Sequence, residues 1–137
     1  MQLSTHLNFS GQCEAAFKFY QKCFGGENLL MMKWGDSPMA SQAPQGWSGK
    51  IMHATFTAGG FRLMGADSPP SNYEKPQGFA VVFDTGDAAE AERVFAALSE
   101  NAQKTIMPLQ ETFWATRYGM VVDQFGTPWM VNCGKPI

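Results

Sequence analysis

Residues 78–101, GFAVVFDTGDAAEAERVFAALSEN, predict a β-strand followed directly by an α-helix. The apolar run before Asp84 has the length of a buried strand. Asp87 and Glu90 have the spacing of a capping box, in which two side chains bind the backbone at a helix start. The buried stripe of the helix follows from three- and four-residue spacings, at Ala91, Val94, Phe95 and Leu98.

The same order of elements occurs in both halves of the chain. In the second half the helix is followed by three predicted strands, KTIMPL (104–109), TRYGMVVD (116–123) and PWMVNC (128–133). In the first half a two-faced strand at 4–10 leads to an amphipathic helix at 13–26, which stops at Gly25 and Gly26. Its buried stripe is predicted at Ala16, Phe17, Phe19, Tyr20, Cys23 and Phe24. Strands are then predicted at 27–34, 50–58 and 61–67, the last two joined by a Gly59-Gly60 turn.

We therefore expect a single α+β domain over residues 1–137, with one βαβββ module at about 1–68 and a second at about 77–137. Superposing Phe9 on Phe83 aligns the apolar positions of the two helices. The alternative is an α+β domain without internal symmetry, because sequence identity between the halves is negligible. Residues 35–49 form a Gly-, Pro- and Ser-containing loop, and loops of this length are often functional or mobile.

Composition and charge exclude several classes of protein. The formal net charge is −2 and there is no run of like charge, so the chain lacks the basic footprint of a nucleic-acid-binding protein. No apolar stretch approaches the roughly 18–20 residues that span a membrane, and the N-terminus lacks signal-peptide features. Cys13, Cys23 and Cys133 do not have metal-site spacing, and we expect reduced thiols in a cytoplasmic protein.

Two blocks of the sequence carry a resemblance to a known family. The opening block, LNFSGQCEAAFKFYQKCFGGE (7–27), contains G-x-C-x-x-A and a helix that ends in F-G-G-E. The closing block, MPLQETFWATRYGMVVDQFGTPWMVN (107–132), contains M-P-x-x-x-T-F-W and D-x-F-G-x-x-W. Both resemble the PhnB-like branch of the vicinal oxygen chelate superfamily, which has the glyoxalase and bleomycin-resistance fold. Some members of this branch carry the name 3-demethylubiquinone-9 3-methyltransferase.

The resemblance implies a fold and leaves the chemistry open. In this fold two βαβββ modules form a curved mixed eight-stranded sheet around a cup, with the helices outside. The resemblance also implies a homodimer, because glyoxalase-like proteins often build the cup as dimers. Members share the scaffold and differ in the residues that line it, so function must be inferred from the site itself.

Strand alternation predicts which residues face the cup. The residues expected to face the helices are Leu7, Phe9, Met52, Ala54, Phe56, Trp129, Val131 and Cys133. The residues between them are His6, Asn8, His53, Thr55, Met130 and Asn132. We take His6, Asn8, His53 and Asn132 as candidate ligand-binding residues, with Trp114 as an apolar wall.

Each candidate also has an ordinary structural interpretation. His53 and Thr55 would suit a solvated sheet face, and His6 would suit the surface near the N-terminus. Asn132 would suit a cap on the last strand, and Trp114 would suit the core. No catalytic residue is assigned; Glu111, close to Trp114 in the sequence, is either a general base or a solvated turn residue.

The donor set argues against a catalytic metal. Metal-dependent relatives take ligands, mostly His and Glu, from the first, fourth, fifth and eighth strands, and a catalytic site needs about three such donors. Here those strands offer His6 and the neutral Asn132, with Asp67 and Asp84 only at strand exits. We therefore expect no catalytic metal and no cofactor, since phosphate-loop and dinucleotide-binding glycine motifs are also missing.

Two functions follow from these observations. In the first, the cup binds a small, partly aromatic molecule without chemistry, using the polar candidates as anchors and Trp34, Trp47 and Trp114 as walls. In the second, the protein is a glyoxalase-like enzyme, either metal-free or with an unorthodox ligand set such as His6, His53 and a carboxylate. Methyl transfer is disfavoured, because it would need a cofactor pocket in a doubly wound sheet.

Overall fold

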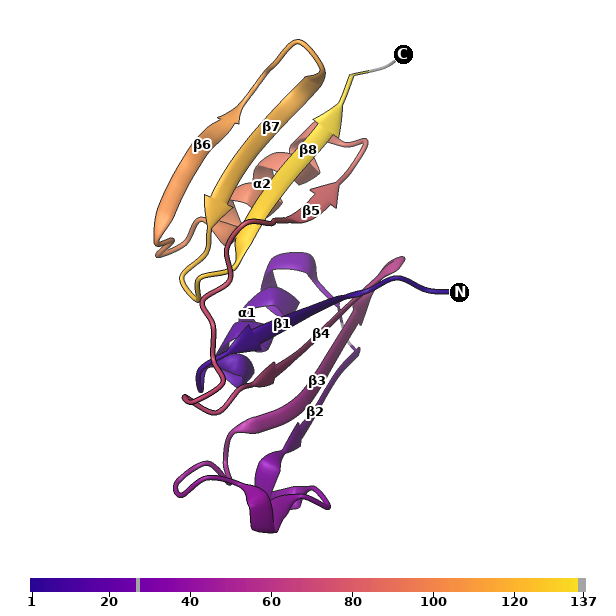
Figure 1. The fold of residues 1–137 in the computed structure, drawn as a ribbon. Helices are drawn as coiled ribbons and strands as arrows, with labels where there is room; N and C mark the ends of the chain where they lie inside the picture. Colours follow the sequence, from indigo (N-terminus) through magenta and orange to yellow (C-terminus); the bar gives the residue numbers. More distant parts are fainter. Residues whose placement is uncertain (27, 136–137) are drawn as a thin grey trace. The chain divides into compact units, whose positions relative to one another are not determined.

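The computed structural model describes residues 1–26 and 28–135 and divides the chain into two compact units, with the boundary between Lys75 and Pro76 (Figure 1). The first unit contains β1 (Thr5–Phe9), α1 (Cys13–Phe24), β2 (Asn28–Lys33), β3 (Ile51–Ala58) and β4 (Phe61–Asp67). The second contains β5 (Val81–Asp84), α2 (Ala88–Leu98), β6 (Lys104–Gln110), β7 (Ala115–Val122) and β8 (Pro128–Gly134). The predicted order of elements is therefore confirmed in both halves.

Each unit has one four-stranded mixed sheet with the same topology. The strand orders are β1-β4-β3-β2 and β5-β8-β7-β6. The first and last strands of each module pair in parallel, and the other neighbours are antiparallel. The α+β class is confirmed, with the eight strands divided between two sheets. The joint cup and the single-domain organisation stay predictions.

The loop between β2 and β3 contains two short helical turns. These are the 3₁₀ helices η1 (Trp34–Asp36) and η2 (Ala40–Gln42). The hydroxyl of Ser37 donates to the carbonyl oxygen of Trp34 at 2.8 Å and accepts from the amide of Met39 at 3.1 Å. Most of the loop is thus organised by local hydrogen bonds. In the described part of the chain, no helix has the length and apolar character needed to cross a bilayer.

The core of the first unit lies between α1 and one face of its sheet. Leu7 and Phe9 are buried, and the ring of Phe17 meets those of Phe9 and Tyr20 edge-on, at centroid distances of 6.2 and 5.8 Å. The buried stripe of α1 is Cys13, Ala16, Phe17, Tyr20 and Cys23. Phe19 and Phe24, predicted as part of the stripe, are only half-buried because they lie at its margins.

Strand β3 departs from the predicted alternation at Met52. Met32 pairs with His53 and Lys33 with Ile51, so Met52 is an extra residue, a β-bulge. On the N-terminal side of the bulge, the alternation of buried and exposed side chains is therefore shifted by one residue. Ile51 is therefore buried with Ala54 and Phe56, and Met52, predicted to face the helix, is only half-buried.

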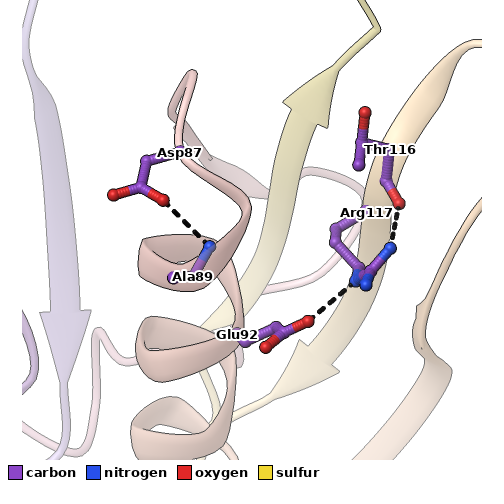
Figure 2. A network of polar contacts seen from close by, with 5 residues as sticks. All are labelled: Asp87, Ala89, Glu92, Thr116 and Arg117. Carbon is purple, nitrogen blue, oxygen red and sulfur yellow. Dashed lines mark hydrogen bonds and ion pairs between the residues drawn. The ribbon is translucent and has the colours of Figure 1, made fainter.

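The two helices begin in different ways. Helix α2 has its own cap, because Asp87 Oδ1 accepts from the amide of Ala89 at 3.0 Å (Figure 2). The predicted capping box is wrong in its second half: Glu90 accepts from the hydroxyl of Thr85 at 2.7 Å, and that hydroxyl accepts from the amide of Asp87. Helix α1 has no side-chain cap of its own, and the amides of Gly11 and Cys13 at its start donate to the distant carboxylate of Asp67.

Helix α2 is also tied to its sheet by a charged pair. Arg117 on β7 donates through Nε to Glu92 Oε1 at 2.9 Å and through Nη1 to the carbonyl oxygen of Thr116 at 2.8 Å (Figure 2). Arg117 is thus committed to the face of the sheet that α2 covers. This leaves its neutral neighbour Tyr118 for the opposite face.

Gly65 on β4 is expected to tolerate no side chain. A Cβ there would lie 2.6 Å from Cε1 of the buried Phe17 ring and 2.9 Å from the carbonyl oxygen of Leu7. We expect Gly65→Ala to lower the free energy of unfolding by about 1–3 kcal/mol, because overpacking forces the helix away from the sheet. Urea unfolding tests this, with Gly49→Ala, where a Cβ meets open space, as the control. Equal stability of the two variants would contradict it.

Candidate functional site

The face of the second sheet that α2 does not cover carries two rows of side chains. We call the helix-free face of each sheet its open face. Val121, Trp129, Val131 and Cys133 are buried, and α2 packs on that side of the sheet. Residues directly paired across strands project to the same side. The opposite side therefore carries an apolar row, Met107, Met120, Met130 and Val82, and a polar row, Gln110, Tyr118, Asn132 and Asp84.

Asn132 is the central residue of the polar row. Its Nδ2 donates to Asp84 Oδ1 at 3.3 Å, and this carboxylate determines which way the amide points, because the amide oxygen would be repelled there. The other end, Oδ1, is buried and has no hydrogen-bond partner in the described structure. A buried acceptor without a donor costs about 1–3 kcal/mol, which a ligand donor would recover.

Aromatic side chains flank this row near Tyr118 on β7. The rings of Trp114 and Tyr118 meet edge-on at 5.2 Å, and those of Phe113 and Trp114 at 4.7 Å. Trp114 is 45% exposed and Phe113 is 88% exposed, so the core-packing interpretation of Trp114 is wrong. Tyr118 donates its hydroxyl to the sulfur of Met130 at 3.4 Å, which links the two rows.

The other candidate residues lie on the open face of the first sheet. His6 and Thr55 both pair with Met64, on either side of it, and Asn8 pairs with Ala66. Thr55 Oγ1 lies 3.0 Å from Nε2 of His53. His6, Asn8 and His53 are exposed, as the alternation of β1 predicts for the first two.

The surroundings of His6 shift its pKa. Partial burial, with a smaller contribution from the nearby charge of His53, lowers the pKa of His6 below its ordinary value of 6.5. The folded state therefore binds this proton more weakly than the unfolded state does. The resulting contribution to stability is complete above pH 6.5 and is lost as the pH falls toward the folded pKa.

We expect an NMR titration of the His6 ring to give a pKa below 6.5. In His53→Gln the value should rise only part of the way back, because burial is the larger cause. A full return to the ordinary value would show that the charge of His53 dominates instead. An unchanged value would show that the two rings are not coupled.

The donors of the described residues do not form a metal centre. No group of three or more His, Cys, Asp or Glu side chains is placed to hold a metal ion in residues 1–26 and 28–135. Glu111, the candidate base, is exposed and forms an ion pair with Lys135 at 3.2 Å. All three cysteines are buried thiols, and burial, then the nearby Asp67, raises the pKa of Cys13.

The five predicted ligand-binding residues thus fall into two groups. His6, Asn8 and His53 share the open face of the first sheet, and Trp114 and Asn132 share the second unit. Sequence reasoning missed Asp84 and Tyr118 as neighbours of Asn132. The signal for them was register: both lie directly opposite Asn132 on the strands that flank β8.

Comparison with known proteins identifies the family. A family model described as 3-demethylubiquinone-9 3-methyltransferase matches residues 1–132. The chain belongs to this family. It is 37% identical over 143 residues to protein YjdN of Escherichia coli (strain K12), with 98% of this chain and 97% of YjdN covered.

Solved structures agree with this family and with the predicted superfamily. Protein PA1353 from Pseudomonas aeruginosa superposes with a TM-score of 0.89 at 42% identity, over 99% of each chain. A PhnB protein from Bacillus cereus gives 0.79 at 24% identity, over 96% of this chain and 98% of that one. The fosfomycin resistance protein FosX from Listeria monocytogenes shares the fold alone, at a TM-score of 0.63 and 11% identity over 98% and 94%. The predicted PhnB-like membership of the vicinal oxygen chelate superfamily is therefore confirmed.

Proposed function

We propose that this family member binds a small, partly aromatic molecule on the open face of its second sheet, without a catalytic metal. The observation that carries the proposal is the desolvated Oδ1 of Asn132, which has no donor in the described structure. Ligand pockets combine apolar walls with a few polar groups that fix orientation. Here the methionine row and Trp114 would supply the walls, and Asn132 the anchor.

The position of Asn132 also supports an adaptable site. Methionine side chains are flexible and polarisable, so they adjust to ligands of irregular shape. Oδ1 has no exposure to solvent, so a donor reaches it only when neighbouring side chains shift. Half-buried Tyr118, which pairs with Asn132, its neighbour Met130 and the exposed Trp114, whose ring meets that of Tyr118, are the side chains we expect to shift.

The proposal also covers the polar residues of the first unit, the cellular compartment and the oligomeric state. His6, Asn8 and His53 offer a second polar face to a ligand. We also propose a cytoplasmic homodimer, on the strength of buried thiols and of the dimers common among glyoxalase-like proteins. Light scattering of the purified protein tests the dimer, and a monomer mass would refute it.

Neither catalytic alternative has comparable support. Methyl transfer, the activity in the family description, would need a cofactor pocket in a doubly wound parallel sheet, and both sheets here are mixed, with antiparallel pairs. A metalloenzyme based on His6, His53 and a carboxylate would need a third donor near the pair. The described residues supply no such group of three.

A thermal-shift screen of small aromatic and amphipathic molecules tests the proposal. We expect compounds that raise the melting temperature of the protein, since a ligand that binds only the folded state stabilises it. Asn132→Ala should weaken their binding about tenfold, the effect of one lost buried hydrogen bond. The control is Asn72→Ala, an exposed loop position in the first unit. Compounds that bind both variants equally would refute the role of Asn132.

A further inference from the structure

Acceptors predominate among the hydrogen-bonding groups of the polar row. Asp84 contributes a carboxylate, and Asn132 contributes Oδ1, while one N–H of its Nδ2 is bound to Asp84. The hydroxyl hydrogen of Tyr118 is committed to Met130, which leaves its oxygen to accept. The donors of the row are the amide of Gln110, at its β6 end, and the second N–H of Asn132 Nδ2. A ligand that satisfies this row must therefore bring donors.

The charges of the second unit lead to the same conclusion. Arg117 faces α2 and is bound to Glu92 and to a carbonyl oxygen (Figure 2). Lys135 is paired with Glu111 at 3.2 Å. Lys104 lies opposite Val122, four residues along β7 from Tyr118, which is about 13 Å at the rise of a strand. Asp84 is thus not paired with Arg117, Lys135 or Lys104 among the described residues of this unit, and Arg93 lies on α2, which covers the other face of the sheet.

The apolar row and Trp114, on the same face of the second sheet, suit the apolar body of a ligand that brings hydrogen-bond donors. Exposed Trp114 offers an aromatic ring, and aromatic faces attract organic cations. Met120 and Met130 and the 55% exposed Val82 provide a flat apolar surface one row away. A donor group at the polar row would place an attached ring over these side chains.

We propose that the ligand is an organic cation, a protonated amine on a flat apolar body, with its ammonium group between Asp84 and Oδ1 of Asn132. This inference rests on the proposed function and names the ligand class of that same site. Asp84 then has two roles: it orients the amide of Asn132, and it neutralises the ligand charge. An anionic ligand would instead meet the carboxylate of Asp84 with repulsion.

Three indoles of similar size separate these possibilities at pH 7: tryptamine, which is a cation, 3-propylindole, which is neutral, and indole-3-propionate, which is an anion. We measure their dissociation constants by equilibrium dialysis with the full chain. Tryptamine should bind about tenfold more tightly than 3-propylindole, and indole-3-propionate most weakly, as expected for one charge-assisted contact. Asp84→Asn should weaken tryptamine about tenfold and leave 3-propylindole within about twofold. Asp36→Asn, an exposed position in the first unit, is the matched control.

The outcomes distinguish this inference from the proposed function. Equal binding of tryptamine and 3-propylindole, both weakened by Asn132→Ala, would overturn the cation inference and leave the binding function standing. Preference for indole-3-propionate would overturn it in the same way. Failure of all three to bind at millimolar concentration would also overturn it, and the thermal-shift screen would then judge the proposed function alone.

Discussion

Replacing Asp67 with alanine is expected to lower the free energy of unfolding by about 3–5 kcal/mol, a large part of the 5–15 kcal/mol typical of a domain. Asp67 is 1% exposed and ends β4. Its Oδ1 accepts from the amides of Gly11 and Cys13, both at 2.9 Å, and its Oδ2 accepts from the amide of Ile51 at 2.8 Å. One carboxylate thus joins the start of α1, the start of β3 and the end of β4.

The expected loss follows from the three amides. In Asp67→Ala each of them loses its acceptor in a place where water has little access, and a buried unsatisfied group costs about 1–3 kcal/mol. Asp67→Asn should be intermediate, because one amide nitrogen would then face a backbone N–H. Urea unfolding measures both, with Asp36→Ala, an exposed position, expected within about 0.5 kcal/mol of the unmodified protein. A loss below about 1 kcal/mol in Asp67→Ala would contradict this role.

Asp123→Ala is expected to have a similar effect in the second unit, about 3–5 kcal/mol. Asp123 is fully buried, and its Oδ1 accepts from the amides of Phe125 and Thr127 at 2.8 and 3.0 Å. Its Oδ2 accepts from Nε1 of Trp129 at 2.9 Å. The side chain therefore holds the turn between β7 and β8 and fixes the buried ring of Trp129, the second residue of β8.

A double-mutant cycle isolates the contact with Trp129. Asp123→Asn replaces one carboxylate oxygen with an amide nitrogen. When the remaining oxygen accepts from the amides of the turn, the new N–H groups face Nε1–H of Trp129, and two donors then oppose each other. Adding Trp129→Phe removes the opposing donor, so the double variant should lose less stability than the sum of the two single variants. Additive losses in urea unfolding would show that the contact contributes nothing of its own.

Local pattern was enough to predict most of the fold. Apolar periodicity gave all eight strands and both helices, and the alternation of Leu7 and Phe9 with His6 and Asn8 is observed. The alternation failed at Met52, because a bulge adds one residue to β3 and is set by pairing with β2. Pairing of this kind joins distant parts of the chain, and a single sequence does not reveal it.

The site was less accessible to sequence reasoning for the same reason. Asn132 was predicted from the polarity of one residue in an apolar strand, but Asp84 and Tyr118 become its neighbours only through register. Asp67 and Asp123 were predicted only as the last residues of strands, and their structural role depends on amides that fold against them. Trp114 was weighed as core because indole rings are usually buried, whereas here it lies beside a polar row.

The methyl groups of the methionines give the most direct test of the binding face. Met107, Met120 and Met130 lie on the open face of the second sheet, whereas Met32 and Met64 belong to the first unit. NMR spectra of protein labelled at the methionine methyl carbons are recorded while a compound from the thermal-shift screen is added. The account predicts that the signals of Met107, Met120 and Met130 move most, and that Asn132→Ala weakens the response. Shifts confined to Met32 and Met64, with those three signals unmoved, would contradict it.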